Sequence, residues 1–77
     1  MNAKLLKSKM VLYGDEDFVS AISKLLEISR QTASSKLHGK TKFTQTEIAT
    51  ISRHYGLTAE EIRLIFVGED NDSERSG

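Results

Sequence analysis

The sequence predicts an all-α fold, a compact bundle of five short helices. Apolar residues recur at helical spacing along most of the chain, and proline is absent. Four apolar segments are each followed by a glycine, which often ends a helix in the left-handed conformation. These glycines are Gly14, Gly39, Gly56 and Gly68. With 77 residues, the chain has room for one domain at 1–68, followed by an acidic tail at 69–77 that we expect to be disordered.

The first helix is predicted over about residues 3–13 and the second over about 15–26. Asp15 is the expected N-cap of the second helix, because a short acidic side chain accepts hydrogen bonds from the free amides there. Asp17 is the alternative start. The apolar face of the first helix is expected to consist of Leu5, Leu6, Met10, Leu12 and Tyr13. That of the second is expected to consist of Phe18, Ile22, Leu25 and Leu26.

The third helix, from the N-cap Ser29 through His38, is unusually polar. Only Ala33 and Leu37, four residues apart, are suited to anchor it against a core. The other side chains are polar and mostly short. A helix of this kind gains little from packing, so its exposed face is either idle or contacts a polar partner.

The fourth and fifth helices begin with the same pattern, at residues 43–48 (Phe-Thr-Gln-Thr-Glu-Ile) and 57–62 (Leu-Thr-Ala-Glu-Glu-Ile). Each places a threonine N-cap three residues before a glutamate, with apolar residues on both sides, which is a capping box within a hydrophobic staple. The helices are therefore expected from Thr44 to about Tyr55 and from Thr58 to about Val67. The inward residues are expected to be Ile48, Ile51, Tyr55, Ile62, Ile65 and Phe66. Residues 62–67 are also rich in strand formers, so a final β-strand is the alternative.

Positive charge is segregated along a chain whose net charge is zero. Segment 29–43 contains Arg30 and three lysines but no acidic residue, whereas segment 69–77 contains four acidic residues and one arginine. Zero net charge argues against binding a polyanion by bulk charge, but a local basic segment favours it.

The second helix, a short connection and the polar third helix form a helix-turn-helix layout within about 20 residues. In such a layout the first helix braces the second, whose polar face is free to enter a DNA major groove. Ser23 is a small residue on the bracing helix, and Ala33 allows the second helix to approach closely.

Residues 28–34 (Ile-Ser-Arg-Gln-Thr-Ala-Ser) resemble the turn and recognition-helix start of Cro and phage-repressor-like (XRE-type) helix-turn-helix proteins. Residues 36–40 (Lys-Leu-His-Gly-Lys), followed by the Phe-Thr-Gln helix start, resemble a subgroup of small prophage regulators. The resemblance covers about residues 10–67. It implies a lambda-repressor-like DNA-binding domain that works as a homodimer on a near-palindromic operator and regulates transcription in the bacterial cytosol or nucleoid. Glu27 stands where the family usually has glycine.

The layout and the resemblance lead to site predictions. Arg30 can bond a guanine edge and Gln31 an adenine edge, while short serines allow close approach. The expected base-reading residues are Arg30, Gln31, Ser34 and Ser35. The expected DNA-backbone contacts are Ser29, Lys36, His38, Lys40, Thr41 and Lys42. Each of these residues also has a plainer interpretation, as an ordinary solvated surface residue.

Leu64 and Val67 are the candidate dimer interface. They are three residues apart and are directed away from the inward residues of the fifth helix, so they form a second apolar stripe. The alternative is that both belong to the core.

Other classes of function are not expected. The chain has no cysteine, no paired histidine spacing and no glycine-rich phosphate loop, so we expect no catalytic site, metal, cofactor or small-molecule substrate. Without an apolar run long enough for a membrane span, or a secretory signal, we expect a cytoplasmic protein with no membrane partner. The alternative function is a helical module that binds a protein, such as an anti-repressor.

Overall fold

The structure, a computed structural model, describes residues 1–67. All regular elements of these residues are helical, and none is a strand. The helices are α1 (Ala3–Tyr13), α2 (Phe18–Leu26), α3 (Arg30–Leu37), α4 (Gln45–Tyr55), α5 (Ala59–Ile62) and the π-helical segment η1 (Arg63–Val67). The predicted all-α class is therefore confirmed over residues 1–67. The tail predicted at 69–77 lies outside the described residues.

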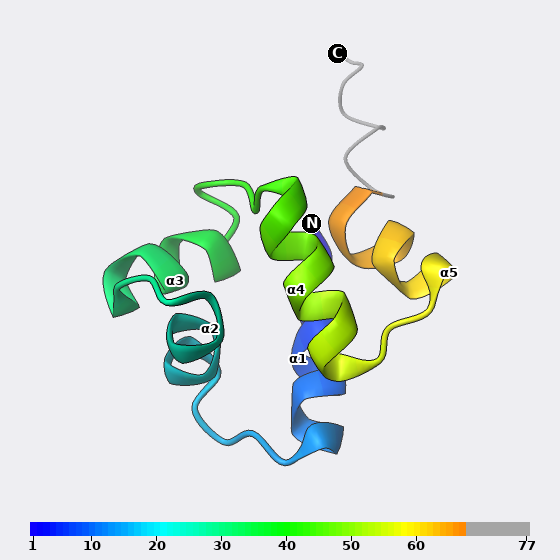
Figure 1. The fold of residues 1–77 in the computed structure, drawn as a ribbon, viewed down its shortest axis with the longest axis horizontal. Coiled ribbons are helices and arrows are strands. Elements are labelled where there is room, and N and C mark those ends of the chain that lie inside the picture. Colours follow the sequence, from blue (N-terminus) through cyan, green and yellow to red (C-terminus); the bar gives the residue numbers. More distant parts are fainter. Residues whose placement is uncertain (68–77) are drawn as a thin grey trace.

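α1 and α4 lie in the middle of the molecule, with α2 and α3 on one side and α5 on the other (Figure 1). α2 packs against both α3 and α4, and α1 packs against α4 and η1. One cluster of buried apolar side chains holds these elements together. Its members are Leu6, Met10, Ile22, Ala33, Leu37, Ile51 and Ile65. α1, α2, α3, α4 and η1 thus contribute to a single core, to which α3 supplies an alanine and one leucine.

The two predicted capping boxes are present. The hydroxyl of Thr44 accepts the amide hydrogen of Glu47, and the Glu47 carboxylate accepts that of Thr44. Thr58 and Glu61 repeat the arrangement at the start of α5. These reciprocal bonds satisfy amides that lack a partner within the helix, and they fix where α4 and α5 begin.

The N-cap of α2 lies two residues after the first predicted one, Asp15. Asp17, the alternative start, is the N-cap, and its carboxylate accepts the amide hydrogen of Ser20. The Asp15 carboxylate instead accepts a hydrogen bond from the hydroxyl of Tyr55. Burial and this bond to Asp15 raise the pKa of Tyr55, so the hydroxyl remains the proton donor. Asp15 therefore ties the loop between α1 and α2 to the end of α4.

The last described segment is helical, so the strand alternative for residues 62–67 is wrong. α5 continues directly into the π-helical turn η1, whose Ile65 is completely buried. The ring of Phe66 contacts that of Phe43 edge to face, with 5.6 Å between centroids. The capping box at Thr58 starts a helix, and burial of Ile65 on one helical face keeps it in register with the core.

The predicted apolar face of α1 is correct at Leu6 and Met10, which are buried, but wrong at its C-terminal end. Leu12 is 81% exposed because the last turn of α1 passes beyond the helices that cover the core. Tyr13 is also largely exposed, although its ring contacts those of His54 and Tyr55.

Candidate nucleic-acid interface

The chain reverses between α2 and α3 through the three residues Glu27, Ile28 and Ser29. Glu27 has φ 59°, in the left-handed region. Ser23 holds this turn from α2: its carbonyl accepts the amide hydrogen of Ile28, and its hydroxyl donates to the Ile28 carbonyl at 2.6 Å. Ser29 then caps α3 by accepting the amide hydrogen of Thr32. The small residue predicted to matter on α2 therefore acts by hydrogen bonding to the turn.

α3 buries one face and exposes a polar one. Ala33 and Leu37 are buried, as predicted. Arg30, Gln31 and His38 are exposed, while Ser34 and Ser35 are partly covered. Of the four predicted base-reading residues, Arg30 and Gln31 are therefore exposed and the two serines are half-buried.

Lys36, which is predicted to contact the DNA backbone, is buried. Its side chain is 8% exposed, and its Nζ lies 2.9 Å from Glu47 Oε1 and 3.1 Å from the carbonyl oxygen of Lys42. A lysine buried in this way has its charge compensated within the protein and cannot reach a phosphate. Lys36 is accordingly removed from the predicted DNA-backbone contacts.

Arg30 is accessible but not free. A guanidinium nitrogen of Arg30 lies 3.5 Å from a carboxylate oxygen of Asp17, with the two side chains 62% and 57% exposed. The bond from the Ser20 amide and, after it, the positive charge of Arg30 lower the pKa of Asp17, which favours the charged form. An ion pair this exposed is weak, so Arg30 can exchange it for another anionic or hydrogen-bonding partner.

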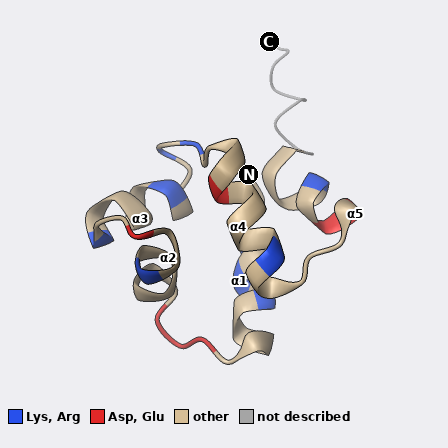
Figure 2. Cartoon of the chain, in the orientation of Figure 1, with Lys and Arg blue, Asp and Glu red and all other residues tan. Residues whose placement is uncertain are grey.

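The loop after α3 carries exposed basic side chains next to the polar face. Lys40, Thr41 and Lys42 are all exposed. The amide of Lys40 donates to the Ser35 carbonyl at 2.9 Å, which anchors the start of the loop to α3. Figure 2 shows blue segments on α3 and on this loop, whereas the nearest red segments lie at the preceding turn and on α4. Because Lys36 is buried and paired, the exposed positive charge of this region comes from Arg30 and the loop lysines, and further blue segments lie on other helices.

His38 ends α3 with a fixed ring orientation. Its Nδ1 lies 2.9 Å from the Ser34 carbonyl oxygen, which can only accept, so Nδ1 carries a hydrogen and donates. The ring is therefore held against the last turn of α3.

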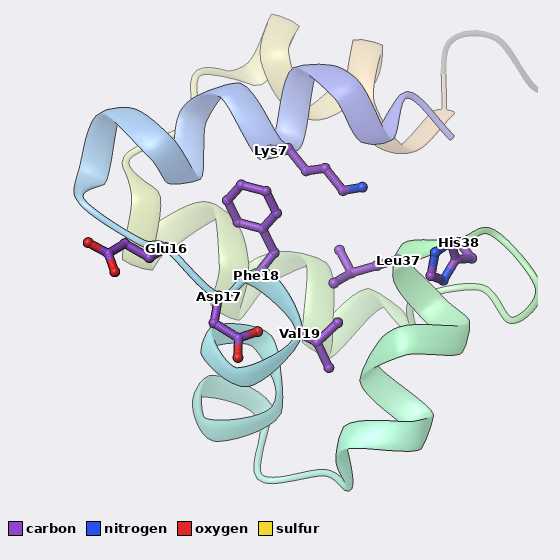
Figure 3. Close-up of a pocket in the computed structure, with 7 residues that line it drawn as sticks. All are labelled: Lys7, Glu16, Asp17, Phe18, Val19, Leu37 and His38. Atoms are coloured by element: carbon purple, nitrogen blue, oxygen red, sulfur yellow. The ribbon is translucent and has the colours of Figure 1, made fainter.

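A cleft with mixed charges borders this surface, where the start of α2 and the end of α3 meet α1 (Figure 3). Phe18, Val19 and Leu37 form its apolar part, and the other lining residues are polar or charged. The residues lining it are Lys7, Glu16, Asp17, Phe18, Val19, Leu37 and His38. The acidic side chains of Glu16 and Asp17 mark the limit of the basic surface.

Three residues that support this surface were not predicted. Glu47 was recognised only as a helix cap, and nothing in the sequence indicated that it pairs with a lysine eleven positions earlier. Asp17 was not connected with Arg30. Thr32 is exposed on α3, and its Oγ accepts a hydrogen bond from Ser29. Thr32 directly follows Gln31 on the polar helix, and this position alone could have marked it as a candidate DNA contact.

The predicted dimer residues lie on the other side of the molecule from α3. Leu64 is 40% exposed and Val67 is 48% exposed, both on η1. α4 and α1 separate this segment from α2 and α3 (Figure 1). An apolar surface and a polar helix face are thus presented by opposite sides of one small domain.

No family model, curated protein or solved structure matches this chain. Over residues 1–67, no helix is sufficiently long and apolar to span a bilayer. In the same part of the chain, histidine, aspartate and glutamate side chains form no group of three or more that could hold a metal ion. The candidate interface therefore has to be judged on its own geometry.

Proposed function

We propose that this chain is a sequence-specific, double-stranded-DNA-binding transcriptional regulator of the Cro and phage-repressor type. α2, the turn and α3 act as its helix-turn-helix, with α3 as the recognition helix in the major groove. The observation that carries the proposal is the two-sided character of α3, a short helix with Ala33 and Leu37 buried and polar side chains exposed. A helix with so little apolar surface gains little from packing, and a binding role for its polar face accounts for such a composition.

The residues divide into two roles. Arg30 and Gln31, at the exposed N-terminal end of α3, read base edges through paired hydrogen bonds. Ser34 and Ser35 are short enough for the helix backbone to approach the bases. The remaining exposed residues contact sugar and phosphate, which sets the position of the protein on the duplex. These residues are Ser29, His38, Lys40, Thr41 and Lys42.

Self-association is the second part of the proposal. Leu64 and Val67 expose apolar surface on η1, away from the polar face of α3. A twofold pair formed through this stripe presents two recognition helices to half-sites about 34 Å apart. This arrangement suits a near-palindromic operator.

The experiment that tests the proposal starts by selecting bound duplexes from a random pool. Fluorescence anisotropy then measures affinity for the selected and a scrambled duplex across a salt series. Counterion release predicts that log affinity falls linearly with log salt, with a slope of about 0.9 for each phosphate neutralised. A flat salt dependence, with no preferred sequence, would contradict the proposal.

A protein-binding module is the competing function, and one observation favours it. Val11, Leu12 and Tyr13 form an exposed apolar segment at the end of α1. Such a segment suits a protein partner. The salt series separates the two functions, because binding through an apolar surface depends weakly on salt.

A further inference from the structure

The buried ion pair of Lys36 and Glu47 joins α3 to the start of α4. Lys36 Nζ donates to Glu47 Oε1 at 2.9 Å and to the Lys42 carbonyl at 3.1 Å. The two side chains are 8% and 17% exposed. The ammonium also lies over the ring of Phe43, 5.8 Å from its centroid. Lys36 therefore bonds to both the loop that follows α3 and the helix that follows the loop.

Glu47 is a fixed acceptor for this lysine. The oxygen that binds Lys36 Nζ also accepts the amide hydrogen of Thr44 in the capping box. Although burial raises the pKa of Glu47, the hydrogen bonds from Thr44 and Lys36 outweigh it and lower the value. Glu47 thus stays charged, and its position is set by the first turn of α4.

The basic loop is consequently held at both ends from α3. At its start, the amides of Gly39 and Lys40 donate to carbonyls of Lys36 and Ser35. At its far end, the Lys36 side chain holds the carbonyl of Lys42. Between these anchors Lys40 and Thr41 expose their side chains, so the backbone that carries them is held next to α3.

A buried lysine is an expensive way to gain stability. Removing an ammonium from water costs several kcal/mol, and apolar replacements of buried ion pairs are often neutral or stabilising. An apolar residue at position 36 would pack against Phe43 but could not bind the Lys42 carbonyl. Stability alone therefore does not explain why a lysine occupies position 36, whereas its hydrogen bond to the Lys42 carbonyl does.

We infer that Lys36 is a positioning residue, which holds the basic loop at 40–42 in register with α3 so that both meet one duplex together. This inference rests on the proposed function. It predicts that the lysines of the loop depend on Lys36 for their contribution to binding, although Lys36 itself touches no DNA.

A double-mutant cycle between Lys36→Met and Lys40→Ala tests the inference. In the parent, Lys40→Ala should lower the salt slope by about 0.9. Lys36→Met alone should lower it by about twice that amount, because Lys40 and Lys42 both lose their positions. In the Lys36→Met background, Lys40→Ala should then change affinity less than twofold. Additive losses, with the full effect of Lys40→Ala retained, would overturn the inference.

A measurement on the protein without DNA distinguishes failure of this inference from failure of the proposed function. Heteronuclear ¹⁵N relaxation of the free protein should show residues 39–43 becoming mobile in Lys36→Met, with α3 unchanged. A loop that stays rigid overturns the inference whatever the DNA result. A parent that binds no duplex overturns the proposed function and, with it, the role in DNA binding.

Glu47→Gln is the second variant, in case Lys36→Met does not fold. Glutamine keeps an oxygen that accepts the Thr44 amide but removes the charge that holds Lys36. It should mobilise the loop partly and weaken coupling to Lys40→Ala. If the loop stays rigid in this variant and its loss of affinity is additive with that of Lys40→Ala, the inference is also overturned.

Discussion

The guanidinium of Arg30 pairs with the carboxylate of Asp17, so the first residue of α3 is tied to the N-cap of α2. Both side chains are more than half exposed. In the free protein this pair therefore occupies the guanidinium of Arg30. Under the proposed function, base reading by Arg30 has to replace the Asp17 contact, and the negative charge of Asp17 disfavours a phosphate nearby.

Asp17→Asn is predicted to tighten DNA binding. Asparagine remains a good N-cap, so α2 should start at the same place. The variant removes both the competing partner of Arg30 and a negative charge, which should raise affinity by no more than about fivefold, the range of exposed ion pairs. Anisotropy titrations at constant salt measure this. Glu16→Gln is the matched control, because it removes a neighbouring charge that does not pair with Arg30. Equal gains for both variants would show that charge alone, without release of Arg30, is responsible.

Glu27→Gly is predicted to stabilise the fold. Glu27 has φ 59°, a conformation that costs an L-residue roughly 1 kcal/mol and glycine nothing. For a domain of this size, the melting temperature should rise by roughly 4–8 °C. Gly56→Ala is the reciprocal control: Gly56 has φ 65° and no atom within 4 Å of an added Cβ, so the loss should reflect the backbone alone. A melting temperature unchanged in both variants would contradict the strain argument.

Stability is predicted to fall in acid partly through Glu47. Its pKa is lowered in the folded state: burial raises it, but the Thr44 amide and Lys36 lower it more. A group with a lowered folded pKa stabilises the protein above its unfolded value, and this contribution is lost as the pH falls through the folded value. Urea midpoints should therefore decline as the pH falls below the ordinary glutamate pKa of about 4.3, and decline less in Glu47→Gln. Parallel declines in the two proteins would exclude Glu47 as a source.

Leu64→Glu is predicted to prevent self-association. Leu64 is 40% exposed on η1, so a charge there should leave the fold intact while disfavouring an apolar contact between two copies. Sedimentation equilibrium of both proteins over a concentration series, with circular dichroism as a fold control, measures this. If the parent is a monomer at every concentration, with and without duplex, this stripe is not a dimer interface.

The helix starts could be predicted from the sequence because their causes are local. Thr44 and Glu47 lie three residues apart, and the chemistry of the capping box is complete within that interval. Ala33 and Leu37 were assigned correctly to the core for the same reason, since helical spacing alone places them on one face. The division of α3 into a small buried apolar face and a polar remainder could therefore be predicted from local features.

Contacts between distant segments could not be predicted in this way. Lys36 lies on the same face as Ala33 and Leu37. A lysine is nevertheless expected to be exposed, because the sequence does not show that its acceptors are at positions 42 and 47. Asp15 looked like a helix cap, yet its partner is Tyr55, forty residues away. Leu12 has an ordinary core side chain, and only the arrangement of the other helices shows that nothing covers it.

The most direct test of the central claim is the effect of Gln31→Ala on the ratio of affinities for the selected and scrambled duplexes. Gln31 is exposed on the polar face of α3, and loss of a paired base contact should lower this ratio about tenfold or more. Lys40→Ala, measured beside it, should weaken both duplexes alike and leave the ratio unchanged. If Gln31→Ala leaves the ratio unchanged, or if both variants lower it equally, α3 does not read DNA sequence in the way proposed.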